Sequence, residues 1–230
     1  MGSDDLFKKR KAARKNRKCE IRIPKPHSYL IVTEGERTEP LYFNGLTTLI
    51  KEQTNGGILE VIPVPHISIH GEGSSTTSLI HKTDEYVNKS KILYQHIWVV
   101  FDKDDFLDFD EAIQLAKDKG YNIAWSNQSF EYWIYLHFHY SDSALHRHEW
   151  NNKLDEIFKQ YNLGDGTYQK NYENIYDLLN NTYSSTDTAI RNAKRRLDNF
   201  DIHTLPSTYD PATTVHILVE ELQQYLDVLQ

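Results

Sequence analysis

The first 140 residues alternate between short apolar runs and segments whose apolar residues repeat with helical spacing. Four runs have the length and composition of buried strands, at residues 28–33, 59–69, 96–101 and 122–125. Helical spacing lies between them, in segments that begin near Thr38 and at residues 76–89 and 111–120. Strands that alternate with helices predict a parallel sheet flanked by helices. Pro63 and Pro65 interrupt the second run, which places that strand at an edge or a bend.

The rest of the chain predicts mostly helices. Ser129 is a good N-cap for a helix in which Phe130, Trp133 and His137 share one face. Further helical stripes lie between Trp150 and Tyr161, across residues 186–200, and from a cap at Asp210, with Pro211 in the first turn, to the end of the chain. We therefore expect a basic N-terminal tail at residues 1–26, an α/β core at 27–140, and a helical C-terminal extension at 141–230 that packs on the core.

Carboxylates follow two of the predicted strands directly. Glu34 comes after the first strand, and Asp102, Asp104 and Asp105 come after the third. In open α/β sheets the carboxyl ends of strands meet at the crevice where ligands bind. Two carboxylates 4 Å apart repel by about 4 kcal/mol at an effective dielectric of about 20, so such a cluster needs a cation. Oxygen-only ligands suit Mg²⁺ or Mn²⁺. The alternative is that these acids are solvated loop residues or helix caps.

A third polar cluster follows the fourth strand, at residues 126–131. Glu131 falls in the first turn of the helix that Ser129 caps, where the helix dipole favours a carboxylate. Glu131 is therefore either a residue that stabilises the helix end or a ligand of a second metal at the same edge of the sheet. For His137, core packing with a hydrogen bond is the first expectation, and a place in the site is the second.

The order and spacing of these motifs resemble a known family. Glu34-Gly35 after one strand and Asp102-Lys103-Asp104 after another, about seventy residues later, resemble the Toprim pattern of topoisomerases, primases and OLD-type nucleases. The fuller strings LIVTEGERTEPLYF, VVFDKDD, SNQSFEYWIYLHF and DPATTVHILVEEL, with the basic start and the Tyr168-Gln169-Lys170 tract, resemble the RloB family of Toprim-related proteins. The resemblance covers nearly the whole chain.

The resemblance implies a Toprim-like, mostly parallel sheet and a Mg²⁺- or Mn²⁺-dependent endonuclease that hydrolyses RNA or DNA. It also implies an antiphage effector that works beside a separately encoded ATPase. Glu34, Asp102 and Asp104 would be catalytic and hold the metal, with Asp105 and Glu131 as ligands of a second ion. Arg37, Lys103, Asn127 and Lys170 would bind the substrate. Glu34 could instead be a general acid or base, as in the Toprim topoisomerases.

Charge is divided unevenly along the chain. Residues 1–25 hold ten Lys and Arg against three acidic residues, whereas the remainder holds sixteen against thirty. The basic start could attach the protein to a phosphate backbone, or it could be a solvated tail or a segment that docks on a partner protein. Cys19 is the single cysteine, and no apolar run is long enough to span a membrane or to form a secretory signal. We expect a cytoplasmic protein without disulfides.

Several alternatives remain open on the sequence. A non-catalytic module that binds nucleic acid or regulates a partner is the first rival, and a primase-like nucleotidyltransferase is the second. The Gly71-Glu72-Gly73-Ser74-Ser75 loop either cradles a phosphate or simply turns the chain, and it lacks the lysine of a P-loop. His146-Arg147-His148 is the densest histidine group, but it has no second ligand pair at the spacing of a zinc site. The choice of RNA or DNA and the oligomeric state stay undetermined.

Overall fold

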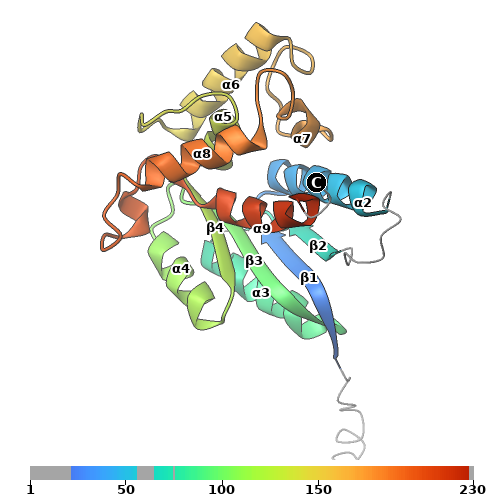
Figure 1. Cartoon of the computed structure of the whole chain (residues 1–230). Helices are drawn as coiled ribbons and strands as arrows, with labels where there is room; N and C mark the ends of the chain where they lie inside the picture. The colour runs from blue at the N-terminus through green and yellow to red at the C-terminus, as the bar shows by residue number, and fades with distance from the viewer. Residues whose placement is uncertain (1–21, 56–64, 75, 228–230) are drawn as a thin grey trace, which may run out of the picture.

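The structure, a computed structural model, describes residues 22–55, 65–74 and 76–227 (Figure 1). Its centre is a five-stranded sheet with the strand order β2-β1-β3-β4-β5. The strands are β1 (Ile23–Thr33), β2 (His66–Gly71), β3 (Ile92–Asp102), β4 (Asn122–Asn127) and β5 (Ala212–Thr213). The first four pair in parallel, and β5 is antiparallel to β4. The predicted α/β class with a mostly parallel sheet is confirmed.

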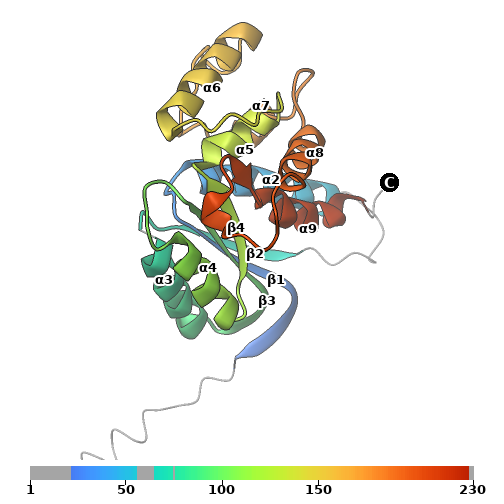
Figure 2. The same cartoon turned by 90° about the vertical axis from the view of Figure 1, so that its left-hand side faces the viewer.

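Helices cover both faces of the sheet (Figure 2). Two helices, α3 (Thr76–Lys89) and α4 (Phe109–Asp118), pack on one face. The other face carries α2 (Thr38–Asn55), α5 (Phe130–Leu136) and α9 (Val215–Asp227), and the remaining helices α6 (Arg147–Tyr161), α7 (Ile175–Leu178) and α8 (Thr186–Leu197) pack around these. A short 3₁₀ turn, η1 (Pro206–Thr208), precedes β5.

The central strands are apolar on both faces because both faces are covered. In β1, Tyr29 and Ile31 pack into the core beneath α2 and α9, whereas Leu30 and Val32 pack against the α3 and α4 side. The same alternation holds in β3, where Trp98 belongs to the first core and Val99 to the second. Continuous rather than alternating apolar runs are typical of parallel strands buried in this way.

The strand order contains a topological switch point between β1 and β3. From β1 the chain moves outward to β2, and it then returns to place β3 on the opposite side of β1. The two connections leave the sheet in opposite directions there and open a crevice at the carboxyl ends of the strands, where doubly wound sheets bind their ligands. Glu34 follows β1 directly and Asp102 is the last residue of β3. The fold therefore puts both acids at the switch point.

Two predicted boundaries near the ends of the chain are wrong. The first strand begins at Ile23 rather than at residue 28, so the sheet includes Pro24 and Pro26, which were assigned to the tail. Pro24 is tolerated because β2 pairs with β1 only from Ser28 onward, and β1 is irregular between Lys25 and Tyr29. Most of the predicted basic tail, residues 1–21, and the start of the predicted second strand, residues 59–64, lie outside the described residues.

The predicted last helix also starts later than expected. Residues 210 and 211 do not open a helix; the chain next forms β5, and α9 begins at Val215. Thr213 accounts for this, because it pairs with Ser126 and its hydroxyl donates to the carbonyl of Trp125 at 3.0 Å. The predicted extension thus contributes a strand to the sheet, and α9 fills the core beneath β1. Among the described residues, no helix has the length and apolar character needed to cross a membrane.

Candidate functional site

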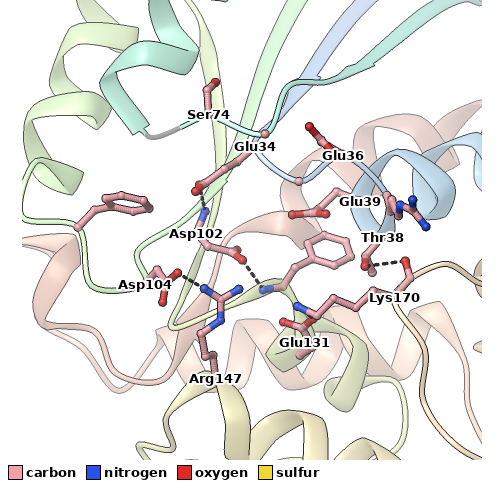
Figure 3. A pocket seen from close by; sticks show the side chains of 15 residues that line it. Glu34, Glu36, Thr38, Glu39, Ser74, Asp102, Asp104, Glu131, Arg147 and Lys170 are labelled. Carbon is pink, nitrogen blue, oxygen red and sulfur yellow. Dashed lines mark hydrogen bonds and ion pairs between the residues drawn. The ribbon is translucent and has the colours of Figure 1, made fainter.

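A cavity of about 450 Å³ opens at the carboxyl end of the sheet, at the switch point (Figure 3). Within the part of the chain that the structure describes, six acids and three basic residues line it. The acids are Glu34, Glu36, Glu39, Asp102, Asp104 and Glu131, and the basic residues are Arg37, Arg147 and Lys170. Acidic charge therefore exceeds basic charge in a partly enclosed space. The sequence predicted four of these acids and two of these basic residues.

Glu34 is fixed between the ends of β1 and β3. Its backbone N–H donates to the carbonyl of Val100 at 2.8 Å, and its side-chain Oε2 accepts the backbone N–H of Asp102 at 3.1 Å. Burial, followed by the charges of Glu39 and Asp104, raises the pKa of Glu34 to about 7 against the opposing effects of the hydrogen bond from Asp102 and the charge of Arg147. The carboxyl is therefore close to half-protonated at neutral pH.

Asp102 caps helix α5 from a neighbouring strand. Its Oδ2 accepts the backbone N–H of Phe130, the first residue of α5, at 3.0 Å. The prediction that Ser129 caps this helix is right in position, but the Ser129 side chain makes no capping hydrogen bond. Burial, followed by the charges of Glu39, Glu34 and Glu131, holds the pKa of Asp102 well above its usual range. Asp102 thus serves the fold and the cavity together.

Glu39 is a member of the cluster that the sequence analysis missed. It lies in the first turn of α2 and is buried, and Figure 3 shows its carboxylate directed into the same space as that of Asp102. Burial raises the pKa of Glu39 to about 7, with a further contribution from the charge of Glu131. Gly35 makes room for it, since a Cβ at that position would lie 1.9 Å from Oε2 of Glu39. The available signal was its position, because Glu39 lies in the first turn of a helix that starts shortly after Glu34.

Glu131 enters the cavity from the first turn of α5, as one of the two interpretations predicted. Its side chain is 3% exposed and pairs with Nζ of Lys170 at 2.6 Å. The hydroxyl of Tyr168 also donates to Oε1 of Glu131, at 3.4 Å. Lys170 reaches the cavity from the segment after α6, and its carbonyl accepts the hydroxyl of Thr38 at the start of α2. The predicted substrate-binding residue Lys170 is therefore at the site, where it pairs with a buried acid.

Asp104 pairs with Arg147, a second cavity residue that the sequence analysis missed. Arg147 is the first residue of α6, and its Nη1 donates to Oδ2 of Asp104. Asp104 has a left-handed backbone, with φ of 43°, which is uncommon for residues other than glycine and is tolerated best by Asp and Asn. Its Oδ1 is buried and has no hydrogen-bond partner among the described residues. One oxygen of Asp104 thus points at a guanidinium, and the other is unused.

Other predicted site residues lie away from the cavity lining. Asp105 is exposed, because the left-handed turn at Asp104 directs the next residue outward. The charge of Lys103 acts on Asp210. Burial raises the pKa of Asp210, and a hydrogen bond from Gln128 and the charge of Lys103 partly offset that effect. Asn127 is buried, and its Nδ2 donates to the carbonyl of Ser207 at 3.1 Å. The arrangement gives no support to metal or substrate contacts by these three residues.

Three further expectations concern residues around the cavity. Arg37 lines it and is exposed at its mouth. The glycine-rich loop reaches the cavity through Gly73, whose N–H already donates to the carbonyl of Glu34 at 2.8 Å. Phosphate binding by this loop stays a prediction. His137 belongs to the core, with its Nε2 3.2 Å from the hydroxyl of Tyr42, and burial lowers its pKa to about 4.

The side chains present suit a hard divalent cation in donor type and charge. The cavity offers carboxylate oxygens, which Mg²⁺ and Mn²⁺ prefer, together with an unpartnered oxygen on Asp104 and raised carboxyl pKa values that a cation would relieve. In the described residues, however, no three His, Cys, Asp or Glu side chains are already arranged to hold a metal ion. Asp104 and Glu131 are held by Arg147 and Lys170 instead. The donors fit, and metal binding would require rearrangement of these ion pairs.

Comparison with known proteins identifies the family. A family model described as RloB-like protein matches residues 29–222. The chain belongs to the RloB-like family. No curated protein and no solved structure matches it. The match to the RloB-like family begins in β1 and ends in α9, so it includes both the α/β core and the C-terminal segment that completes the sheet.

Proposed function

We propose that this RloB-like protein is a Mg²⁺- or Mn²⁺-dependent endonuclease that hydrolyses phosphodiester bonds in RNA or DNA. The observation that carries the proposal is the group of buried and half-buried carboxyls around an open cavity at the switch point, with the pKa of Glu34 and Glu39 raised to about 7. Groups whose charged form is so disfavoured are typical of sites that bind a cation or transfer a proton.

The electrostatic cost of the cluster supports a cation rather than a purely structural role. Two carboxylates 5 Å apart repel by about 3 kcal/mol at an effective dielectric of about 20, and several pairs share this cavity. Arg147 and Lys170 form ion pairs with two of the six acids, which leaves Glu34, Glu36, Glu39 and Asp102 without an ion pair among the described side chains that line the cavity. A divalent cation would remove most of this repulsion.

Glu34, Asp102 and Asp104 would hold the metal in this proposal, with Glu39 and Glu131 available to a second ion. A bound divalent cation supplies a polarised phosphate and a water of lowered pKa. Lys170 and Arg37 line the cavity and would contact phosphate oxygens in this proposal. Glu34 has a second possible role, because a carboxyl with a pKa of about 7 can accept or donate a proton at neutral pH.

The biological setting in this proposal rests on family membership and on sequence. We propose that the protein acts in antiphage defence, beside a separately encoded ATPase, and that the basic residues before β1 contact nucleic acid. Support for the last point is the ten Lys and Arg among residues 1–25. The carboxyl-rich cavity would repel a polyanion, so attachment by a basic segment and neutralisation by a metal would both favour substrate binding.

A non-catalytic module is the second candidate, and one observation favours it. Asp104 and Glu131 already have cationic partners, and no described set of side chains is preformed for a metal. In that case the acids would serve the fold, as Asp102 does when it caps α5. The protein would then bind nucleic acid or a partner protein without cutting it.

The test is cleavage by the purified full chain. Labelled RNA and DNA, single-stranded and double-stranded, are incubated with Mg²⁺, with Mn²⁺ and with EDTA. We expect cleavage of at least one substrate with a divalent cation and none in EDTA, and loss of that cleavage in Asp104→Asn. Binding of substrate without cleavage under every condition, also in the presence of the separately encoded ATPase, would favour the non-catalytic module.

A further inference from the structure

Arg147 occupies a position that helix electrostatics disfavours. It is the first residue of α6, where the positive end of the helix dipole makes a cation less favourable by roughly 0.3–1 kcal/mol. The start of this helix is well fixed. The backbone N–H of His146 donates to the side chain of Glu149 at 2.9 Å, and the ring of Trp150 is buried against Tyr132 and Tyr135. Because the start of α6 is held in this way, the Arg147 side chain is held beside the cavity that it lines.

The contact with Asp104 leaves most of the guanidinium unused. A guanidinium has five N–H donors, and among the described residues the hydrogen bond of Arg147 goes from Nη1 to Asp104. The charge of Arg147 also lowers the pKa of Glu34, so it lies within electrostatic reach of the acids at the ends of both β1 and β3. Its side chain is 33% exposed, so an incoming ligand can reach it.

We propose that Arg147 is a substrate-binding residue that exchanges partners, releasing Asp104 when that carboxylate takes up a divalent cation and then binding the phosphate beside it. This inference rests on the proposed nuclease function and deepens it. Carboxylate and phosphate present similar pairs of oxygens to a guanidinium, so one arginine side chain can serve both. Arg147 and the cation thus compete for Asp104, while Arg147 and the cation cooperate in binding the phosphate.

The competing explanation is that the Arg147–Asp104 ion pair only holds α6 in place, and the packing of α6 argues against it. Trp150, Leu154 and Phe158 hold α6 on the core through burial. A partly exposed ion pair adds about 1 kcal/mol or less. The helix therefore stays in place without Arg147, and the ion pair is dispensable for the fold.

The test compares Arg147→Gln and Arg147→Lys with Lys153→Gln, which removes a positive charge from an exposed position on the same helix. Calorimetric titration with Mn²⁺ and no nucleic acid is the first readout. We expect Arg147→Gln to bind Mn²⁺ up to about tenfold more tightly, because the competitor for Asp104 is gone. Arg147→Lys and Lys153→Gln should remain near the wild type.

Affinity for a fluorescent oligonucleotide in Ca²⁺, and cleavage in Mn²⁺, are the second and third readouts. Arg147→Gln should lose about tenfold or more in both, and Arg147→Lys should recover part of each, because an ammonium cannot make the paired hydrogen bonds of a guanidinium. Weaker Mn²⁺ binding in Arg147→Gln, or oligonucleotide affinity equal to that of Lys153→Gln, would overturn the exchange. Wild-type protein that binds Mn²⁺ and oligonucleotide without cutting, also in the presence of the separately encoded ATPase, would overturn the nuclease proposal alone, since the two binding readouts still decide the role of Arg147.

Discussion

Acids beside this sheet fall into two groups whose carboxyl pKa values shift in opposite directions. Around the cavity, the pKa values of Glu34, Glu39 and Asp102 are raised. On the side of α3 and α4, the pKa values of Glu72, Asp84 and Asp108 are lowered. Burial is the largest cause of the raised pKa values around the cavity, whereas beside α3 and α4 its effect is outweighed, and this reversal has a further cause.

The neighbours of each acid account for it. Asp84 accepts the hydroxyl of Tyr121 at 2.6 Å and pairs with Nζ of Lys119 at 2.7 Å. Asp108 accepts the hydroxyls of two threonines that begin α3, at 2.5 and 2.7 Å. In the cavity, by contrast, the neighbours of an acid are mostly other acids. Negative charge on the acids beside α3 and α4 stabilises the fold, whereas negative charge on the cavity acids destabilises it. This contrast is typical of a site where stability is given up for function.

The largest expected effect is on cleavage. Glu34→Gln and Asp102→Asn keep side-chain shape and remove charge, so each should lower metal-dependent cleavage by on the order of 100-fold or more. Asp84→Asn removes the same charge from the other group and should leave the cleavage rate unchanged. Rates at saturating substrate, with circular dichroism to check the fold, make this comparison. Equal losses of cleavage rate in the cavity variants and in Asp84→Asn would show that the cavity acids have no special role in cleavage.

The next effect is on the pH dependence of stability. The pKa of Glu34 and Glu39 is about 7 in the folded protein against 4.5 for the free group, so the folded state binds more protons between these values. The contribution of these two carboxyls to the free energy of unfolding without metal should therefore fall as pH rises from about 4.5 to 7, by at most roughly 3 kcal/mol per group. Burial lowers the pKa of His137 to about 4, which acts in the opposite direction over the same range, so the quantity to follow is the difference between the wild type and the double variant Glu34→Gln, Glu39→Gln. Urea denaturation at a series of pH values measures this fall.

Mg²⁺ or Mn²⁺ should reverse that fall above pH 7, because ligands that bind only the folded state stabilise it. KCl at matched ionic strength is the control and should have little effect. A difference in stability between the wild type and this double variant that stays flat or rises between pH 5 and 8 without metal would contradict the raised pKa values of the cavity group.

Single substitutions should change thermal stability with opposite signs in the two groups. Without metal at pH 8, Glu39→Gln removes a disfavoured charge, and the melting temperature should rise by about 3–6 °C. Asp108→Asn weakens the hydrogen bonds to the start of α3, and the melting temperature should fall by about 2–4 °C. Differential scanning calorimetry distinguishes the two outcomes, and a fall in both variants would mean that Glu39 is held as favourably as Asp108.

The smallest expected effect comes from Gly35→Ala. The added Cβ would meet the carboxylate of Glu39, whose flexible end can move aside, so the fold should survive while Mn²⁺ affinity falls by about tenfold or less. A double-mutant cycle with Glu39→Gln sharpens the result, because alanine at position 35 should add little once the carboxylate is gone. Additive losses in the double variant would show that Gly35 acts independently of Glu39.

The strands, the acids that follow them and Glu131 were predictable, whereas Glu39 and Arg147, which also lie on helices, were not. Glu34 and Asp102 stand at the ends of apolar runs, and parallel strands bring such ends together. Arg147 meets Asp104 across 43 positions of sequence, through the packing of α6 on α5, and no local pattern encodes that contact. Asp105 shows the reverse case, since one left-handed residue turns it away from the site.

The short fifth strand was unpredictable for a related reason. Ala212 and Thr213 are too few to show an alternating pattern, and Pro211 before them resembles a helix start. Their conformation is set by β4, which lies some 85 residues earlier in the chain and supplies the pairing partners Ser126 and Asn127. Local sequence therefore gave the wrong element where a tertiary contact decides the structure.

Packing of α9 beneath β1 has a consequence for how the protein is made. Tyr29 and Ile31 share a core with Leu218 and Leu222, and the hydroxyls of Tyr29 and Tyr225 lie 3.2 Å apart. At a synthesis rate of roughly 5–20 residues per second, the first strand precedes the last helix by roughly 10–40 s. Throughout that interval the part of this face that α9 buries lacks its cover, although α2 is already present. A nascent chain thus carries every cavity acid before the core beneath β1 is closed.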